Sequence, residues 1–340
     1  MSETVEKIRW GVLGVAAIAV KKVIPAMQKG KWSQVTAIAS RDRKKAEDAA
    51  RELGIPKAYG SYEELLADSE VDAIYNPLPN HMHVPWSVKC AAAGKHVLCE
   101  KPLSLTVAEA RELIAARDRY GVKIGEAFMV RTHPQWLRTR ELIRSGAIGE
   151  LRSISGFFSY FNQDPANIRN IPEYGGGALL DIGCYTIMTS RFITGEEPRR
   201  VLGLIQRDPV MKTDRLASAI LDYPSAQAIF TVGTQIVSYQ RMQFFGTRGR
   251  IEVEIPFNAP LDQPCNIYID DGRDLFGGGI RKEVIPTCDQ YTIQGDEFSR
   301  ALRQGGEVPV PLESAFQHMA IIEAVFRSVE SGKWEVPQKL

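Results

Sequence analysis

The chain has 340 residues, more than one ordinary hydrophobic core contains, so we expect two domains. Its 42 Lys and Arg residues against 41 Asp and Glu residues leave a net charge of +1, so no global field draws it to nucleic acid or to an acidic membrane. With 44% hydrophobic and 24% charged residues, the composition is that of a soluble globular protein.

Cysteine usage and the amino terminus suggest the compartment. The five cysteines lie far apart and form no CxxC pair, which argues against a disulfide framework or a zinc site and fits a reducing environment. The first residues, MSETVEKIRW, carry two glutamates and lack the apolar segment of a signal peptide. We therefore expect a cytoplasmic protein with no bound metal and no membrane partner.

The first third of the chain alternates apolar strands with helices. Strands are expected within 9–14, 34–42, 71–79, 96–102 and 122–129, and helices within 17–28, 43–54, 83–95 and 106–121. Strands separated by helices of this length are typical of a doubly wound parallel sheet with right-handed crossovers. We therefore predict an α/β chain with an amino-terminal nucleotide-binding (Rossmann) domain over residues 1–130.

The turn after the first strand is a relaxed form of the glycine-rich dinucleotide fingerprint. It reads Gly14-Val15-Ala16-Ala17-Ile18-Ala19, and small residues there let backbone N–H groups approach a pyrophosphate. The second and third glycines of the pattern are missing, so a merely tight turn is the alternative. Its position between a strand and a helix favours a nucleotide site.

The end of the second strand bears on the choice of cofactor. An acidic residue there would accept hydrogen bonds from a ribose 2′-hydroxyl, whereas this chain has Ser40-Arg41. A hydroxyl and a guanidinium can hold a 2′-phosphate, so NADP(H) is favoured over NAD(H). Asp42 follows directly, and it would weaken this prediction if its side chain turned inward.

The stretch LCEKP, residues 98–102, places charges at the carboxyl end of an apolar strand. Pro102 disfavours the helical region for Lys101, so the lysine is expected in an extended backbone. Glu100 and Lys101 either solvate a turn or line a cleft.

From about residue 150 the pattern changes to that of a mainly antiparallel sheet. Alternating runs are found at 199–206, 216–223, 226–235, 240–246, 249–256 and 265–270, with helices at 178–195 and 312–332. We predict an α+β second domain over 131–340 with a large open sheet.

The second domain contains GGGALLDIGCY, residues 175–185. Asp181 and Tyr185 are four apart on a predicted helix and so share one face. Tyrosine on an apolar helix is normally a core residue, but the aspartate one turn away and the three glycines, which could admit a ligand to the backbone, suggest a site. A phenol needs a nearby cation to exchange protons at neutral pH, and Lys101 is the candidate if the domains bring the two together.

Together, GVLGVAAIA, NPLPNHMH, GKHVLCEKPL, EAFMVR and GGGALLDIGCY resemble the Gfo/Idh/MocA oxidoreductases, in order and over nearly the whole chain. The family pairs a Rossmann domain with an α/β domain whose open sheet often forms the oligomer interface. Many members have Asp-x-x-x-His where this chain has Asp181 and Tyr185. That departure resembles the branch of glucose-fructose oxidoreductase, dimeric dihydrodiol dehydrogenase and NADP-dependent D-xylose dehydrogenase, in which a tyrosine has the proton role.

The resemblance implies roles for individual residues. Lys101, Tyr185 and Asp181 would be catalytic, and these three together with Arg169 would contact substrate. The cofactor would contact Gly14, Ala16, Ala17, Ile18, Ser40, Arg41, Leu78, Pro79, Asn80, His83, Glu100, Lys101 and Arg131. Other roles stay open for three of them, since Asn80 could close a turn, His83 could cap a helix and Arg169 could anchor its loop.

The sequence therefore predicts a cytoplasmic NADP(H)-dependent oxidoreductase acting on a sugar or polyol, as a homodimer or homotetramer joined through the second domain's sheet. Two alternatives remain. One is a non-catalytic NADP-sensing regulator. The other is an enzyme that holds its cofactor tightly and uses it as an internal relay, in sugar–sugar oxidoreduction or glycoside cleavage.

Overall fold

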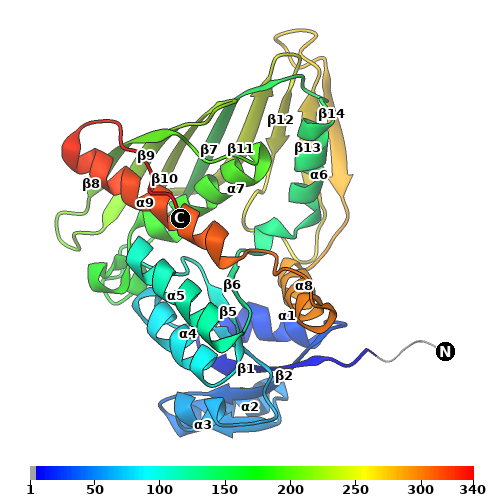
Figure 1. Cartoon of the computed structure of the whole chain (residues 1–340). Coiled ribbons are helices and arrows are strands. Elements are labelled where there is room, and N and C mark those ends of the chain that lie inside the picture. Colours follow the sequence, from blue (N-terminus) through cyan, green and yellow to red (C-terminus); the bar gives the residue numbers. More distant parts are fainter. Residues whose placement is uncertain (1–4) are drawn as a thin grey trace. The chain divides into compact units, whose positions relative to one another are not determined.

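The computed structural model describes residues 5–340 and contains two units (Figure 1). The first comprises Met1–Thr132 and Asp289–Phe316, and the second His133–Cys288 and Gln317–Leu340. The chain crosses from the first unit to the second after Thr132, and residues 289–316 return to the first unit. This return was not predicted.

The first unit is built on a parallel six-stranded sheet with the order β3-β2-β1-β4-β5-β6. The order reverses between β1 and β4, and in such sheets ligands bind beyond the carboxyl ends of the strands at this point. Its elements are β1 (Ile8–Leu13), the π-helix η1 (Ala19–Val23), α1 (Ile24–Gln28), β2 (Ser33–Ala39), α2 (Arg43–Leu53), β3 (Lys57–Tyr59), α3 (Tyr62–Leu66), β4 (Ala73–Asn76), the 3₁₀-helix η2 (Asn80–Met82), α4 (His83–Ala92), β5 (His96–Glu100), α5 (Val107–Tyr120), β6 (Ile124–Ala127), the 3₁₀-helix η3 (Met129–Arg131) and α8 (Gln290–Gln304).

Local capping explains why these helices begin and end where the sequence predicts. In α5 the Thr106 hydroxyl accepts the N–H of Glu109, and the Glu109 carboxylate accepts the N–H of Leu105. The helix ends at Gly121, whose φ of 64° is the left-handed conformation that glycine adopts without strain.

Helix α8 belongs to the first unit because its buried face packs on β1 and on the end of α1. Trp10 Nε1 donates to the hydroxyl of Ser299 at 3.0 Å, and the Trp10 ring lies 5.6 Å from that of Phe298. Asp296 accepts the N–H groups of Lys31 and Trp32. This helix was not predicted.

The second unit contains an eight-stranded sheet with the order β14-β13-β12-β11-β7-β10-β9-β8, in which only the β10–β7 pair is parallel among the described strands. The α/β fold class with a large, mainly antiparallel second sheet is therefore confirmed. Its elements are α6 (Pro134–Arg144), β7 (Leu151–Phe161), η4 (Ile168–Asn170), η5 (Pro172–Tyr174), the π-helix η6 (Leu179–Gly183), α7 (Cys184–Thr194), β8 (Arg200–Arg207), β9 (Asp214–Asp222), β10 (Gln227–Gly233), β11 (Gln235–Gly246), β12 (Arg250–Val253), β13 (Cys265–Asp270), β14 (Ile280–Ile285) and most of α9 (Leu312–Ser331). Strands β7 and β14 and helix α6 are additions to the predicted elements.

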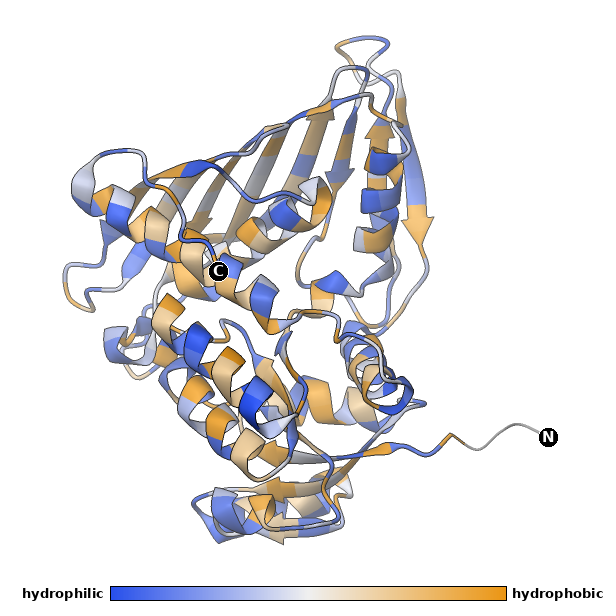
Figure 2. Ribbon diagram, in the orientation of Figure 1, coloured by the Kyte–Doolittle hydropathy of each residue, from blue (hydrophilic) through white to orange (hydrophobic). Residues whose placement is uncertain are grey.

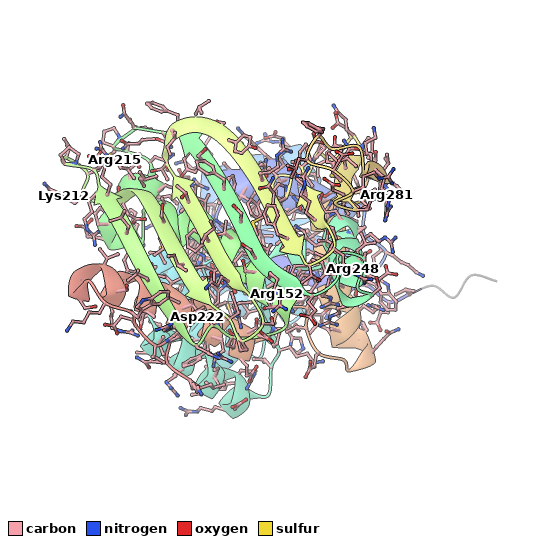
Figure 3. The ribbon with its side chains drawn as sticks, turned by 90° about the horizontal axis from the view of Figure 1, so that it is seen from above. Arg152, Lys212, Arg215, Asp222, Arg248 and Arg281 are labelled. Carbon is pink, nitrogen blue, oxygen red and sulfur yellow. The ribbon has the colours of Figure 1, made fainter. Side chains whose placement is uncertain are left out.

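Helices α6, α7 and α9 cover one face of this sheet (Figure 1). Hydrophobic and hydrophilic residues follow one another along its strands in Figure 2, as expected for a sheet with two different faces. Figure 3 shows the other face of the sheet, with the strands and their side chains in front.

Of the helices within residues 5–340, none is both long enough and apolar enough to cross a membrane.

Candidate active site

The glycine turn of the first unit lies where three parallel strands end. Gly14 has a φ of 80°, its N–H donates to the Ala39 carbonyl at the end of β2, and a Cβ on it would lie 3.1 Å from Leu78 Cδ2, beyond β4. Ala16, Ala17 and Ile18 follow, and η1 begins directly after them. This cradle of small residues fits a dinucleotide pyrophosphate.

The three residues after β2, Ser40, Arg41 and Asp42, have different partners. The Ser40 hydroxyl accepts the N–H of Asp42, and the Asp42 carboxylate accepts the N–H of Lys45 as the N-cap of α2. Asp42 therefore serves its own helix. Burial raises the pKa of the Tyr62 hydroxyl, and the charge of Arg41 and its hydrogen bond act against that rise. The exposed Arg41 therefore lies beside the Tyr62 hydroxyl. The Tyr62 hydroxyl is in turn 3.5 Å from the Cβ position of Gly14.

His83 connects the loop after β4 to the residue after Lys101. Its Nδ1 lies 2.8 Å from the carbonyl oxygen of Pro102 and its Nε2 lies 2.7 Å from that of Leu78. The side chain is 1% exposed, and burial lowers its pKa to about 4, although both carbonyls favour the charged ring. Because both ring nitrogens contact backbone carbonyls of the protein, His83 fits a supporting role better than the predicted direct contact with the cofactor. The neighbouring Pro79 and Asn80 begin η2.

Glu100 ends β5 and interacts with two tyrosines that were not predicted as site residues. The buried Tyr75 hydroxyl donates to Glu100 Oε1 at 2.6 Å, and the Lys101 N–H donates to Oε2 at 3.3 Å. Burial, and after it the charge of Glu100, raises the pKa of Tyr291, while the charge of Lys101 acts the other way. Glu100 and Lys101 are therefore part of an ordered cluster at the carboxyl edge of the sheet. Pro102 follows through a cis peptide bond.

Arg131 ends η3, a short distance beyond β6, and one of its terminal nitrogens contacts the carbonyl of Pro309 at 3.5 Å. This places it after the last strand of the same parallel sheet.

In the second unit, Asp181 is the acceptor for two side chains from different elements. Its Oδ2 accepts the Tyr160 hydroxyl at 2.7 Å and Nε of Arg169 at 3.1 Å. The charge of Asp181, more than any other cause, raises the pKa of Arg169, and Tyr160 and Tyr185 add to this. Arg169 is therefore a cation that acts on both Asp181 and Tyr185 within one unit.

Tyr185 lies in the first turn of α7 and is 7% exposed. Its ring packs against Phe158 and Phe257, with centroids 5.8 and 5.3 Å away. An apolar wall around a phenol, with a guanidinium acting on it, is an environment in which proton transfer by the hydroxyl can be controlled.

Among the three glycines before this helix, Gly176 and Gly177 have other protein atoms packed against their backbone, where a ligand was expected. A Cβ on Gly176 would lie 2.5 Å from the Arg169 carbonyl oxygen, and one on Gly177 would lie 1.9 Å from Oδ1 of Asp214. The expectation that the glycines make room for a ligand is thus corrected, because protein atoms already fill the space at two of them.

The structure accordingly gathers the predicted residues in two groups. In the first unit the glycine turn, Ser40, Arg41, the 78–80 loop, Glu100, Lys101 and Arg131 follow the carboxyl ends of parallel strands. In the second unit Arg169, Asp181 and Tyr185 form one cluster with Tyr160. Tyr160 was missed, since a tyrosine near the end of a strand carries no distinctive local signal.

Two family models match the chain. One, an oxidoreductase family with an NAD-binding Rossmann fold, covers residues 8–128, and the other, the Gfo/Idh/MocA carboxyl-terminal domain, covers residues 136–252. The chain belongs to the Gfo/Idh/MocA oxidoreductase family. This confirms the resemblance found in the sequence.

Individual members of the Gfo/Idh/MocA family match over almost their full length. An uncharacterized oxidoreductase of Rhizobium meliloti is 46% identical, with 96% of this chain and 98% of the relative covered. A D-xylose 1-dehydrogenase (NADP(+)) of Haloferax volcanii is 38% identical, with 95% and 98% covered. The 3-ketoreductase KijD10 of Actinomadura kijaniata, crystallised with NADP and TDP-benzene, has a TM-score of 0.88 at 29% identity, with 95% and 98% covered. The D-xylose enzyme lies in the branch that the sequence suggested.

Proposed function

We propose that the chain is an NADP(H)-dependent oxidoreductase that transfers hydride between nicotinamide and a carbon of a sugar or polyol, while Tyr185 moves the proton. The arrangement around Asp181 carries this proposal: Arg169 is bonded to Asp181 and acts electrostatically on Tyr185, one helical turn away. The guanidinium would stabilise negative charge on the phenol oxygen, which proton exchange at neutral pH requires.

Each residue has a separate part in this proposal. The Tyr185 hydroxyl gives a proton to the substrate oxygen or takes it, and such a placed group contributes about 10²- to 10⁴-fold. Asp181 orients the tyrosine or the substrate. Lys101 orients the reacting oxygen and favours the tyrosinate. The KijD10 reductase has been crystallised with a tyrosine changed to phenylalanine and with a lysine changed to alanine, the residue types assigned here.

The cofactor would be held by the first unit, with the glycine turn at the pyrophosphate and Ser40 and Arg41 at the 2′-phosphate. Asp42 is engaged as a helix cap, which leaves Ser40 and Arg41 as the polar groups for this phosphate. Both the D-xylose relative and the KijD10 reductase are named with NADP. All five cysteines are free thiols, which supports the cytoplasm as the compartment.

The test measures reduced nicotinamide by its absorbance, with NADP⁺ or NAD⁺ and a panel of aldoses, polyols and dihydrodiols. A rate with NADP⁺ and one substrate class, reduced at least tenfold in Lys101→Ala, would support the proposal. Clear NADPH binding without any rate would favour the regulator, and a nicotinamide that copurifies with the protein would favour the internal relay.

We also propose that two copies pair through the uncovered face of the second sheet. Leu204 is 74% exposed and Ile229 is 48% exposed on this face, and charged residues stand at its rim in Figure 3. A shallow apolar hollow lies between them, lined by Ser155, Phe157, Leu202, Leu204, Ile220 and Ile229. An apolar centre with a charged rim is typical of protein interfaces. Light scattering should give at least a dimer for the wild type and a monomer for Ile229→Lys, and a monomeric wild type would contradict the proposal.

A further inference from the structure

We infer that Asp214 is a positioning residue for the helix that carries Asp181 and Tyr185. It is the first residue of β9, far from that helix in the sequence, and its side chain is 2% exposed. Its Oδ2 accepts the N–H of Leu179, the first residue of η6, at 2.6 Å. The inference rests on the proposed function, because it concerns the placement of the tyrosine that moves the proton.

The start of this helix needs an acceptor from elsewhere. The first N–H groups of a helix have no partner within the helix, and a Ser, Thr, Asp or Asn at the N-cap usually accepts one of them. Here the N-cap is Ala178, whose methyl group cannot accept a hydrogen bond. The Asp214 carboxylate, from strand β9, takes the place of the side-chain acceptor that Ala178 lacks. It also puts negative charge at the amino end of the helix, where the helix dipole favours it.

Gly177 links this carboxylate to the two charged groups of the site. Its N–H donates to the Arg169 carbonyl at 2.9 Å, and its own carbonyl accepts the N–H of Asp181 at 3.0 Å. The Asp214 carboxylate occupies the space where a Cβ of Gly177 would lie, at 1.9 Å, and Gly177 has a φ of 123°. Asp214 therefore packs against a residue, Gly177, whose backbone bonds to the backbones of both Arg169 and Asp181.

Asp208 provides a matched control for a purely structural role. It is also a buried aspartate, directly after β8, and its Oδ1 accepts two backbone N–H groups, those of Val210 and Met211, each at 2.8 Å. It therefore stabilises the turn between β8 and β9 by the same kind of bonds, but it does not bond to η6.

The experiment compares Asp214→Ala, Asp214→Asn and Asp208→Ala in turnover, in NADPH affinity and in hydrogen exchange of the amides of residues 178–194. Displacement of a reacting group by about 1 Å costs on the order of 100-fold. We expect Asp214→Ala to lose about 10- to 100-fold in kcat, with NADPH affinity changed by less than about twofold. Asp214→Asn keeps an oxygen for the Leu179 N–H and should retain at least about a tenth of wild-type turnover. Asp208→Ala should keep kcat within about twofold.

Faster exchange of residues 178–194 in Asp214→Ala, and not in Asp208→Ala, would support the inference. Equal kcat losses in Asp214→Ala and Asp208→Ala, or unchanged exchange in both, would overturn it. If Asp214→Ala does not fold, the comparison of Asp214→Asn with Asp208→Asn decides by the same criteria. Failure of the proposed function would instead be seen as absent turnover in the wild type, and the exchange experiment would then decide for Asp214 alone.

Discussion

The Tyr160 hydroxyl donates a 2.7 Å hydrogen bond to Oδ2 of Asp181, the same oxygen that accepts Nε of Arg169. A residue of strand β7 and a residue of the short helix η4 thereby fix one carboxylate, one helical turn before Tyr185. The proposed proton transfer depends on this arrangement, since a carboxylate free to rotate would not hold the guanidinium beside the phenol.

Removal of the Tyr160 hydroxyl should loosen Asp181. In Tyr160→Phe we expect kcat/KM to fall about tenfold, because a hydrogen bond to a charged group is worth about 1.5–3 kcal/mol. Tyr120→Phe, on an exposed face of α5, is the control and should behave as the wild type. Steady-state kinetics with equal activity in all three proteins would show that Tyr160 has no part in the site.

The charge of Arg169 should be visible in the pH dependence of turnover. Arg169→Gln removes the cation that acts on Tyr185, so the rising, acid-side limb of the pH–rate profile for alcohol oxidation, where the tyrosine ionises, should move to higher pH by about one unit. Arg169→Lys keeps the charge and should shift the limb less. A profile of unchanged shape with uniformly lower rates would mean that Arg169 only anchors its loop.

Arg41 should determine the preference between cofactors. In Arg41→Ala we expect NADPH affinity to fall about 10- to 100-fold, the value of one or two charge-assisted hydrogen bonds, with NADH affinity unchanged. Lys44→Ala, an exposed cation on α2, is the control. Fluorescence titration of both cofactors tests this, and an equal loss for NADPH and NADH would contradict contact with the 2′-phosphate.

Asp214 should make stability depend on pH in a predictable sense. Burial raises its pKa to about 6, against three backbone N–H groups that act to lower it. Because the folded state holds this proton more tightly than the unfolded chain, the stabilisation is complete below about pH 4 and is lost as the pH rises through about 6.

Relative to Asp214→Asn, which does not titrate, the wild type should lose up to ~3 kcal/mol of unfolding free energy between about pH 4 and pH 7. Urea unfolding of both proteins across this range measures the difference. A constant difference between them would show that the carboxyl does not titrate in that range.

Much of the first unit follows from local sequence because its signals are local. Apolar strands, caps such as Asp42 and Thr106, and the glycines at 54 and 121 set the boundaries of its elements. The return of α8 could not be predicted in this way. It depends on Trp10 packing against Phe298, almost the full length of the chain away.

Site residues that belong to a short local motif could be predicted from the sequence. Those that join the site only through a tertiary contact could not. Gly14, Lys101, Asp181 and Tyr185 stand in short motifs of small and charged residues. Tyr160, by contrast, meets Asp181 only because β7 pairs with β10 and η6 packs on the same strands. In strand β7 the partly exposed Phe157 and the buried Ser159 interrupt the alternation of apolar and polar residues, so its period-two pattern is weak.

The most direct test of the central claim is the turnover of Tyr185→Phe with NADP⁺ and the best sugar or polyol, measured beside its NADPH affinity. The account predicts a loss in kcat of at least about 100-fold, as expected when a proton-transfer group is removed, with NADPH affinity within about twofold of the wild type. Turnover by Tyr185→Phe close to that of the wild type would contradict it.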